Sequence, residues 1–226
     1  MTGDPTVTYS SEHPMRIAVL ASGGGTNLQA LLDACHAASP VRVVLVLSDK
    51  PDAGALTRAR AAGVETHHLA NPADGAALAR ILADRRVDLV VLAGYLKLVP
   101  ADVVAAFDGR MINIHPALLP AFGGHGMYGL RVHRAVLESG ATLSGASVHL
   151  VNAEYDRGPI VAQWPVPVRP GDTPESLAAR VLEVEHRLLP AVVLAAAHAG
   201  RVVPLVPGRD FGAPDLIPQP REQEAS

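Results

Sequence analysis

The stretch RIAVLASGGGTNLQALLDACHAA, residues 16–38, contains a strand pattern, a glycine-rich turn and a helix pattern in immediate succession. The apolar run 16–22 is nearly continuous, which is typical of a strand buried on both faces. The segment 26–38 carries apolar residues at helical spacing. A strand that leads through a glycine turn into a helix is the first part of a β–α–β unit, and it predicts a parallel sheet.

The same alternation of strand and helix continues for about 100 residues. Further strands are expected at 41–49, 64–70, 87–94 and 110–115, and further helices at 54–63, 74–86 and 100–107. Right-handed crossovers would place these strands in one parallel sheet with helices on both faces.

The pattern changes after a helix expected near 130–139. The segments 143–151 and 159–168 read as strands joined by the short NAEYDRG, which favours an antiparallel hairpin over another β–α–β unit. A long helix follows over 173–200, with Thr173 as its N-cap and Pro174 at its first position. The predicted fold class is therefore a single α/β, Rossmann-like domain with a mostly parallel sheet and an antiparallel hairpin near its C-terminal end.

Length and composition agree with one domain. The chain has 226 residues, of which 49% are hydrophobic and 4% aromatic, so its core is expected to consist of aliphatic side chains. Residues 15–203 are predicted to form the domain. Residues 1–14 and 204–226 are rich in proline, glycine and charge, and both are expected to be flexible tails.

Several classes of protein are disfavoured. The net charge is −3 without a basic run, which argues against nucleic acid as a partner. The single cysteine, Cys35, rules out a disulfide framework and fits a reducing compartment. The sequence contains no apolar run long enough to span a membrane, and its N-terminus does not have the pattern of a signal peptide. We therefore expect a cytoplasmic protein without a membrane partner.

The histidines lack metal-ligand spacing, so no metal is expected. Cys35 lies within the first helix with no histidine signalled beside it, which argues against a nucleophile. The SGG at 22–24 lacks the pattern of a serine hydrolase elbow.

The glycine turn itself suggests a phosphate site. Gly23, Gly24 and Gly25 allow the backbone to approach a ligand, and the helix that follows offers free N–H groups to an anion. Two other interpretations stay open. Asp49 ends the second strand, where an acidic residue could hold a ribose in a dinucleotide site, although Leu28 occupies the third glycine position of that fingerprint. The turn could also simply be tight and bind nothing.

The segment MINIHPALLP, residues 111–120, places Asn113 and His115 on one face of a strand, at its carboxyl end. Ligands bind at that end in open α/β sheets. An amide N–H and an imidazolium side by side could both donate to a developing oxyanion. The alternative is that Asn113 caps a turn and His115 is an ordinary, partly buried histidine.

Asp156 in the hairpin turn favours the catalytic interpretation. If the turn folds over the sheet edge, Asp156 can pair with His115 and raise the pKa of the imidazole. The alternative is that aspartate is merely a good turn residue. Ser147 and His149 share a face of their strand, and are expected to be supporting polar residues rather than a reactive pair.

Five motifs in this order resemble phosphoribosylglycinamide formyltransferases, a folate-dependent family of purine synthesis. They are VLASGGGTNLQALLDA, VVLAGYLKLV, NIHPALLPAF, GASVHLV and YDRGPIVAQ, and the resemblance covers about residues 15–200. It implies a formyltransferase-type domain, an enzyme, 10-formyltetrahydrofolate as co-substrate and glycinamide ribonucleotide as acceptor, both small molecules. A homodimer is left open.

The resemblance also implies roles for individual residues. The catalytic residues would be Asn113, His115 and Asp156. The ribonucleotide would be held by Gly25, Thr26, Asn27 and Glu185. Folate would be bound by Leu96, Lys97, Leu98, Val99, Asn113, Asn152, Ala153, Glu154, Tyr155 and Asp156.

The implied mechanism is direct attack of the substrate amine on the formyl carbon, with the oxyanion stabilised by Asn113 and protonated His115. Asp156 would keep His115 charged and order a water that relays a proton.

The sequence departs from the family at Lys97, where arginine is common, and in the segment 71–77, which lacks the usual basic residue. A 10-formyltetrahydrofolate hydrolase and a non-catalytic nucleotide-binding module are the alternatives. A transfer-RNA formylating enzyme would need a further basic domain.

Overall fold

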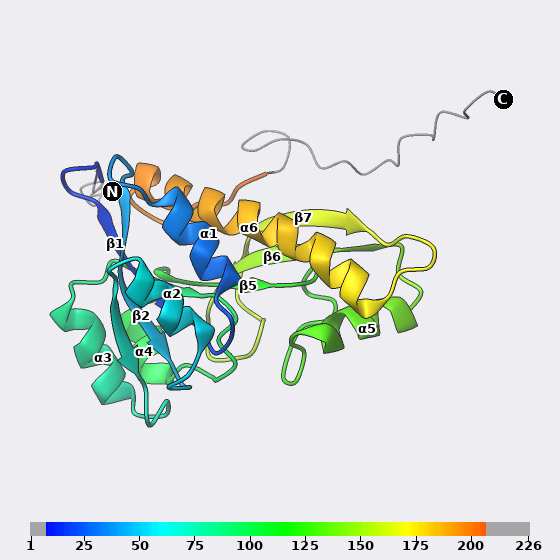
Figure 1. The fold of residues 1–226 in the computed structure, drawn as a ribbon, viewed down its shortest axis with the longest axis horizontal. Coiled ribbons are helices and arrows are strands. Elements are labelled where there is room, and N and C mark those ends of the chain that lie inside the picture. The colour runs from blue at the N-terminus through cyan, green and yellow to red at the C-terminus, as the bar shows by residue number, and fades with distance from the viewer. Residues whose placement is uncertain (1–7, 207–226) are drawn as a thin grey trace, which may run out of the picture.

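Seven strands form one sheet in the computed structural model, which describes residues 8–206 (Figure 1). The sheet has the strand order β3-β2-β1-β4-β5-β6-β7. The strands are β1 Met15–Leu20, β2 Val41–Ser48, β3 Glu65–His68, β4 Leu89–Leu92, β5 Met111–His115, β6 Leu143–Leu150 and β7 Ile160–Pro167. Pairing is parallel from β3 to β5 and antiparallel from β5 to β7. The predicted mostly parallel sheet with an antiparallel hairpin is confirmed.

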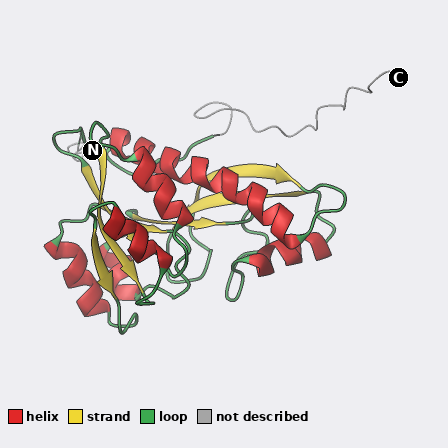
Figure 2. Cartoon of the chain, in the orientation of Figure 1, coloured by secondary structure: helices red, strands yellow, loops and turns green. Residues whose placement is uncertain are grey.

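Helices cover both faces of the parallel strands (Figure 2). They are α1 Thr26–Ala34, α2 Gly54–Ala61, α3 Gly75–Asp84, α4 Ala101–Ala106, α5 Leu130–Glu138 and α6 Pro174–Ala199. In β1, Ile17 and Val19 pack with α1, α2 and α6, whereas Ala18 and Leu20 pack with α3 and α4. Because successive side chains point to opposite faces, a strand between two helix layers must be apolar throughout. This explains the unbroken apolar runs in the sequence.

The antiparallel strands differ, since one of their faces is polar. Ile112 and Ile114 of β5 face the core beneath α6, and the alternate residues Asn113 and His115 face the other side. In the register with β6, Asn113 lies opposite His149 and His115 lies opposite Ser147. Four polar side chains therefore share one face of β5 and β6.

Local signals at the helix ends are confirmed. Thr173 caps α6, and its side chain accepts a hydrogen bond from the Ser176 N–H in a capping box. Gly200, in the left-handed conformation, caps the C-terminal end of α6. The first helix is shorter than expected: α1 ends at Ala34 and not at residue 38.

The expected flexible tails lie largely outside the described residues, which exclude 1–7 and 207–226. Within the described part, Tyr9 packs against the core. The Leu205 N–H donates to the Val161 carbonyl at 2.9 Å. None of the helices in residues 8–206 is long and apolar enough to cross a membrane.

Candidate active site

The glycine-rich turn places the positive end of a helix at the carboxyl edge of the sheet. Gly25 caps α1 with φ 76°, in the left-handed region. A Cβ at this position would lie 2.6 Å from the Cα of Ala55, so both the backbone conformation and the close approach of α2 require glycine. The first turn of α1 has no acidic residue, which leaves its N–H groups suited to an anion.

Asn27 and Glu185 form a buried polar pair beside this turn. Asn27 Nδ2 donates to Glu185 Oε2 at 2.7 Å, from α1 to α6. Burial raises the pKa of Glu185 to about 7, although the hydrogen bond from Asn27 acts to lower it. Asn27 Oδ1 is buried and has no hydrogen-bond partner within the described structure. A ligand that donates a hydrogen bond would satisfy that oxygen.

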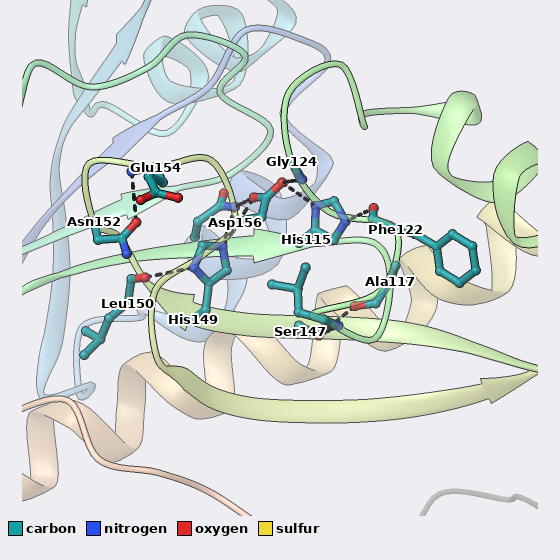
Figure 3. Close-up of polar contacts among 12 residues, drawn as sticks. His115, Ala117, Phe122, Gly124, Ser147, His149, Leu150, Asn152, Glu154 and Asp156 are labelled. Atoms are coloured by element: carbon teal, nitrogen blue, oxygen red, sulfur yellow. Dashed lines mark hydrogen bonds and ion pairs between the residues drawn. The ribbon is translucent and has the colours of Figure 1, made fainter.

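His115 is held on both sides by the protein (Figure 3). The side chain lies at the end of β5 and is 3% exposed. Its Nε2 lies 2.9 Å from the Phe122 carbonyl oxygen and its Nδ1 lies 3.5 Å from Asp156 Oδ2. Since a carbonyl oxygen only accepts hydrogen bonds, the proton of the neutral ring lies on Nε2.

Asp156 reaches this group because the turn between β6 and β7 folds back over the sheet edge. The residue itself has a positive φ of 54°. Its Oδ2 accepts from the Gly124 N–H at 2.9 Å, and its Oδ1 accepts from Asn113 Nδ2 at 3.3 Å. The expected contact between Asp156 and His115 is therefore present.

The expected direction of the His115 pKa shift is wrong. Burial, the largest effect, lowers the pKa of the imidazole below its ordinary value, and nearby His149 adds to the lowering. Asp156 and the Phe122 carbonyl act in the opposite direction but do not offset burial. Sequence reasoning considered the carboxylate but not the depth at which the loop after β5 buries the ring.

Asp156 is shifted toward its ionised form. Burial alone would raise its pKa, but contacts with His149, His115 and the Gly124 N–H outweigh burial and lower it. The site thus combines a carboxylate with a buried imidazole whose charged form is disfavoured without a ligand.

His149 belongs to this group, and sequence reasoning placed it only in a supporting role. Its Nε2 lies 3.0 Å from Asn113 Nδ2 and 3.5 Å from Asp156 Oδ1, and its Nδ1 lies 2.8 Å from the Leu150 carbonyl (Figure 3). The available signal was the alternation of β6: once β5 and β6 are paired, His149 must share a face with Asn113.

Ser147 has the supporting role expected for it. Its hydroxyl donates to the Ala117 carbonyl at 2.6 Å and accepts from the Leu119 N–H at 3.0 Å. Gln163 of β7 donates to the same hydroxyl at 2.9 Å. These bonds fix the chain that leaves β5, and that chain supplies the Phe122 carbonyl to His115.

One cavity of about 670 Å³ connects the two groups. It is lined by eight of the residues expected in the site, namely Asn27, Leu96, Lys97, Asn113, His115, Tyr155, Asp156 and Glu185. It is also lined by residues that sequence reasoning did not place in the site, among them Lys50, Tyr95 and Tyr128. Asp49, considered above for a ribose, lines it as well.

The other expected site residues lie elsewhere. Gly25, Leu98, Val99, Asn152, Ala153 and Glu154 are not part of the cavity wall, and Thr26 lines a separate surface groove. Val99 is buried in the core, and Leu98 is 46% exposed. The Leu96 N–H donates to Ser22 Oγ at 3.0 Å, so it already has a partner. In residues 8–206 no group of three or more metal-ligating side chains is close enough to hold an ion.

Comparison with known proteins identifies the family. The formyl transferase family model matches residues 15–193. A chloroplastic phosphoribosylglycinamide formyltransferase from Arabidopsis thaliana is 48% identical over 83% of this chain and 68% of its own. The phosphoribosylglycinamide formyltransferase of Escherichia coli is 41% identical over 79% of this chain and 85% of its own.

A solved structure gives the same result. The glycinamide ribonucleotide transformylase 1 of Symbiobacterium toebii is 48% identical, with a TM-score of 0.75, and the match covers 82% of this chain and 88% of that one. The chain belongs to the formyl transferase family, and the predicted resemblance, fold and formyltransferase activity are confirmed.

Proposed function

We propose that this formyltransferase moves the formyl group of 10-formyltetrahydrofolate to the primary amine of glycinamide ribonucleotide, a step of purine synthesis. The relatives described above carry that activity in their names. The observation that carries the proposal is the shared cavity, which has Asn27 and Glu185 in one part of its wall and Asn113, His115 and Asp156 in another. A phosphate-bearing amine and a formyl donor could therefore meet in one cavity.

The ribonucleotide would enter with its phosphate at the start of α1. The backbone N–H groups that follow Gly25, with the hydroxyl of Thr26, are suited to the phosphate oxygens. Asn27 and Glu185 would hold the part of the substrate nearest to the amine. With a pKa of about 7, Glu185 can accept a hydrogen bond from that amine while ionised.

The folate would lie between the segment after β4 and the hairpin turn. Leu96 and Lys97 come from the first, and Tyr155 and Asp156 come from the second. Contacts of Leu98, Val99 and residues 152–154 with the folate would have to form through a change in the loops, because these residues are not part of the cavity wall in the free protein.

The chemistry would be direct. The amine nitrogen forms a bond to the formyl carbon, the carbonyl oxygen becomes an oxyanion, and the bond from that carbon to N10 of the folate then breaks. One proton leaves the amine and is taken up by N10, with a water held by Asp156 as the relay. Positioning of the two substrates removes much of the entropic barrier, so the step needs no metal and no covalent enzyme intermediate.

Asn113 and His115 would stabilise the oxyanion. The His115 Nε2–H, which donates to the Phe122 carbonyl in the free protein, would transfer its hydrogen bond to the oxyanion. The new negative charge beside the ring raises the affinity of the imidazole for a proton and acts together with Asp156 against the effect of burial. Loss of one oxyanion donor typically costs about 100-fold to 1000-fold in kcat.

The setting of the reaction follows from the same proposal. Both partners would be small molecules, without nucleic acid or a membrane. A cytoplasmic location suits a purine-synthesis step in a chain with one cysteine.

The test is an absorbance assay for release of deformylated folate, run with and without glycinamide ribonucleotide. Release only with the ribonucleotide, lost in His115→Ala and retained in His68→Ala on the edge strand β3, is the expected result. Release without the ribonucleotide would identify a hydrolase instead. Tight nucleotide binding without any release, unchanged in His115→Ala, would favour a binding module.

A further inference from the structure

We infer that His149 is a positioning residue, whose neutral ring fixes the Asn113 amide so that one amide N–H is directed to the reacting oxygen. The inference rests on the proposed function, because it concerns the oxyanion donor of that reaction. It assigns to β6 a residue that acts on the chemistry only through its neighbour on β5.

The tautomer of His149 is set by the backbone. The ring is 2% exposed, and its Nδ1 lies 2.8 Å from the Leu150 carbonyl oxygen. Because that oxygen only accepts, Nδ1 carries the proton and the neutral ring presents a lone pair at Nε2. This lone pair lies 3.0 Å from Asn113 Nδ2, so His149 accepts a hydrogen bond from the amide.

A second acceptor lies close to the first. Asp156 Oδ1 is 3.3 Å from the same Asn113 Nδ2, and it is 3.5 Å from His149 Nε2. The three distances are nearly equal, so the angle between the two acceptors, seen from Nδ2, is roughly half the angle between the two N–H bonds of a planar amide. One N–H directed between them can serve both. The other N–H is then left for a ligand in the cavity, whose wall includes Asn113.

Protonation of His149 would remove this arrangement. Nε2 would become a donor that opposes the Asn113 N–H and would pair instead with Asp156. The titratable groups that face the ring are Asp156 from the hairpin turn and His115 from β5, whereas Ile160, paired with it on β7, is apolar. The arrangement therefore requires a neutral ring at position 149.

Nitrogen-15 NMR of the histidine rings tests the tautomer without any turnover, so its result is separate from that of the proposed function. The expected signal is a neutral His149 protonated at Nδ1, although neutral histidine in water prefers Nε2. A proton on Nε2, either in the neutral ring or in an imidazolium paired with Asp156, would overturn the inference, because that nitrogen could not accept from Asn113.

Kinetics test the effect on the reaction. His149→Leu removes the acceptor and should lower kcat by about 10-fold to 100-fold with little change in either KM, since the amide is misdirected rather than removed. His149→Gln offers an oxygen acceptor in place of the imidazole nitrogen, and it should keep most of the kcat that His149→Leu loses. His68→Gln on the edge strand is the matched control and should leave kcat unchanged. An unaltered kcat in His149→Leu, or a kcat in His149→Gln as low as that in His149→Leu, would overturn the inference.

Discussion

The two halves of the sheet contribute to the site in different ways. In β1, β2 and β4 both faces are covered by helices and the centres of the strands are apolar, so that polar side chains occur near the strand ends. The edge strand β3 is polar and partly exposed. In β5 and β6 one face lies under α6, and the other carries Asn113, His115, Ser147 and His149 beneath two loop segments. The first half thus offers fixed groups at an edge, and the second offers side chains along a strand.

This difference predicts that the first half of the sheet binds substrate and that the second half carries out the chemistry. A helix end and a strand edge are rigid and suit the binding of a phosphate. Cross-strand pairs under a loop place several hydrogen-bonding groups within 3.5 Å of one carboxylate, as oxyanion chemistry requires. Substitutions in the first half should therefore act mainly on KM or on stability, and those in the second mainly on kcat.

The largest effect is expected for Asp156→Asn. The amide cannot balance the charge of His115 or accept in the same way from both Gly124 and Asn113, so kcat should fall by about 1000-fold while the KM for the ribonucleotide changes little. Steady-state kinetics measure both constants. Asp108→Asn, an exposed carboxylate in the turn before β5, is the control and should match the wild type. A rise in the KM for the ribonucleotide with an unchanged kcat in Asp156→Asn would contradict the different roles of the two halves of the sheet.

Glu185→Gln should change the pH dependence of stability. The folded-state pKa of about 7 lies above the ordinary value of 4.5, so the stability from this group is fully present below about pH 4.5 and is lost as pH rises through 7. Glutamine does not titrate and can donate to the unpaired Asn27 Oδ1. As the pH rises through this range, the unfolding free energy of the variant should therefore increase relative to that of the wild type by about 3 kcal/mol. Urea unfolding of both proteins at pH 5 and at pH 8 measures the difference between their unfolding free energies. The same difference at both pH values would contradict the prediction.

Ser147→Ala should loosen the loop that covers the polar face. It removes three hydrogen bonds and leaves the Leu119 N–H unpaired, which should cost about 2 kcal/mol of unfolding free energy and lower kcat modestly. Chemical denaturation and the transfer assay give the two values. Ser144→Ala is the matched control, because the Ser144 hydroxyl is buried on the same strand and has no hydrogen-bond partner among residues 8–206. Its loss should be nearly neutral. Equal costs at the two positions would contradict the role of Ser147.

The smallest effect is expected on the binding side, for Asn27→Ala. Loss of the amide should raise the KM for the ribonucleotide about 10-fold with kcat nearly unchanged, since the interaction is made equally in the ground state and the transition state. Gln29→Ala, two residues further along α1 and not part of the cavity wall, serves as the control. A large fall in kcat with an unchanged KM would show that the first half also takes part in the chemistry.

The sequence allowed the rigid half to be predicted well. Continuous apolar runs and the glycine turn are local signals, because each depends on residues a few positions apart. The shared face of Asn113 and His115 likewise follows from the period of a strand.

The loop-covered half was less predictable, because its contacts depend on register and on irregular backbone. The pairing of Asn113 with His149 needs the alignment of two residues that lie 36 positions apart, on different strands. The lowered pKa of His115 results from burial of the ring, and this burial depends on the irregular loop after β5, in which Phe122 has a φ of 56°. Neither follows from local residue pattern.

The most direct test of the central claim follows the formyl carbon itself. The enzyme is incubated with 10-formyltetrahydrofolate labelled with carbon-13 at the formyl group and with glycinamide ribonucleotide, and carbon-13 NMR identifies the product. The label should appear in a formamide on the ribonucleotide, at a rate that collapses in Asp156→Asn. Label found in free formate would mean that water, not the amine, attacks the formyl carbon, and would contradict the account.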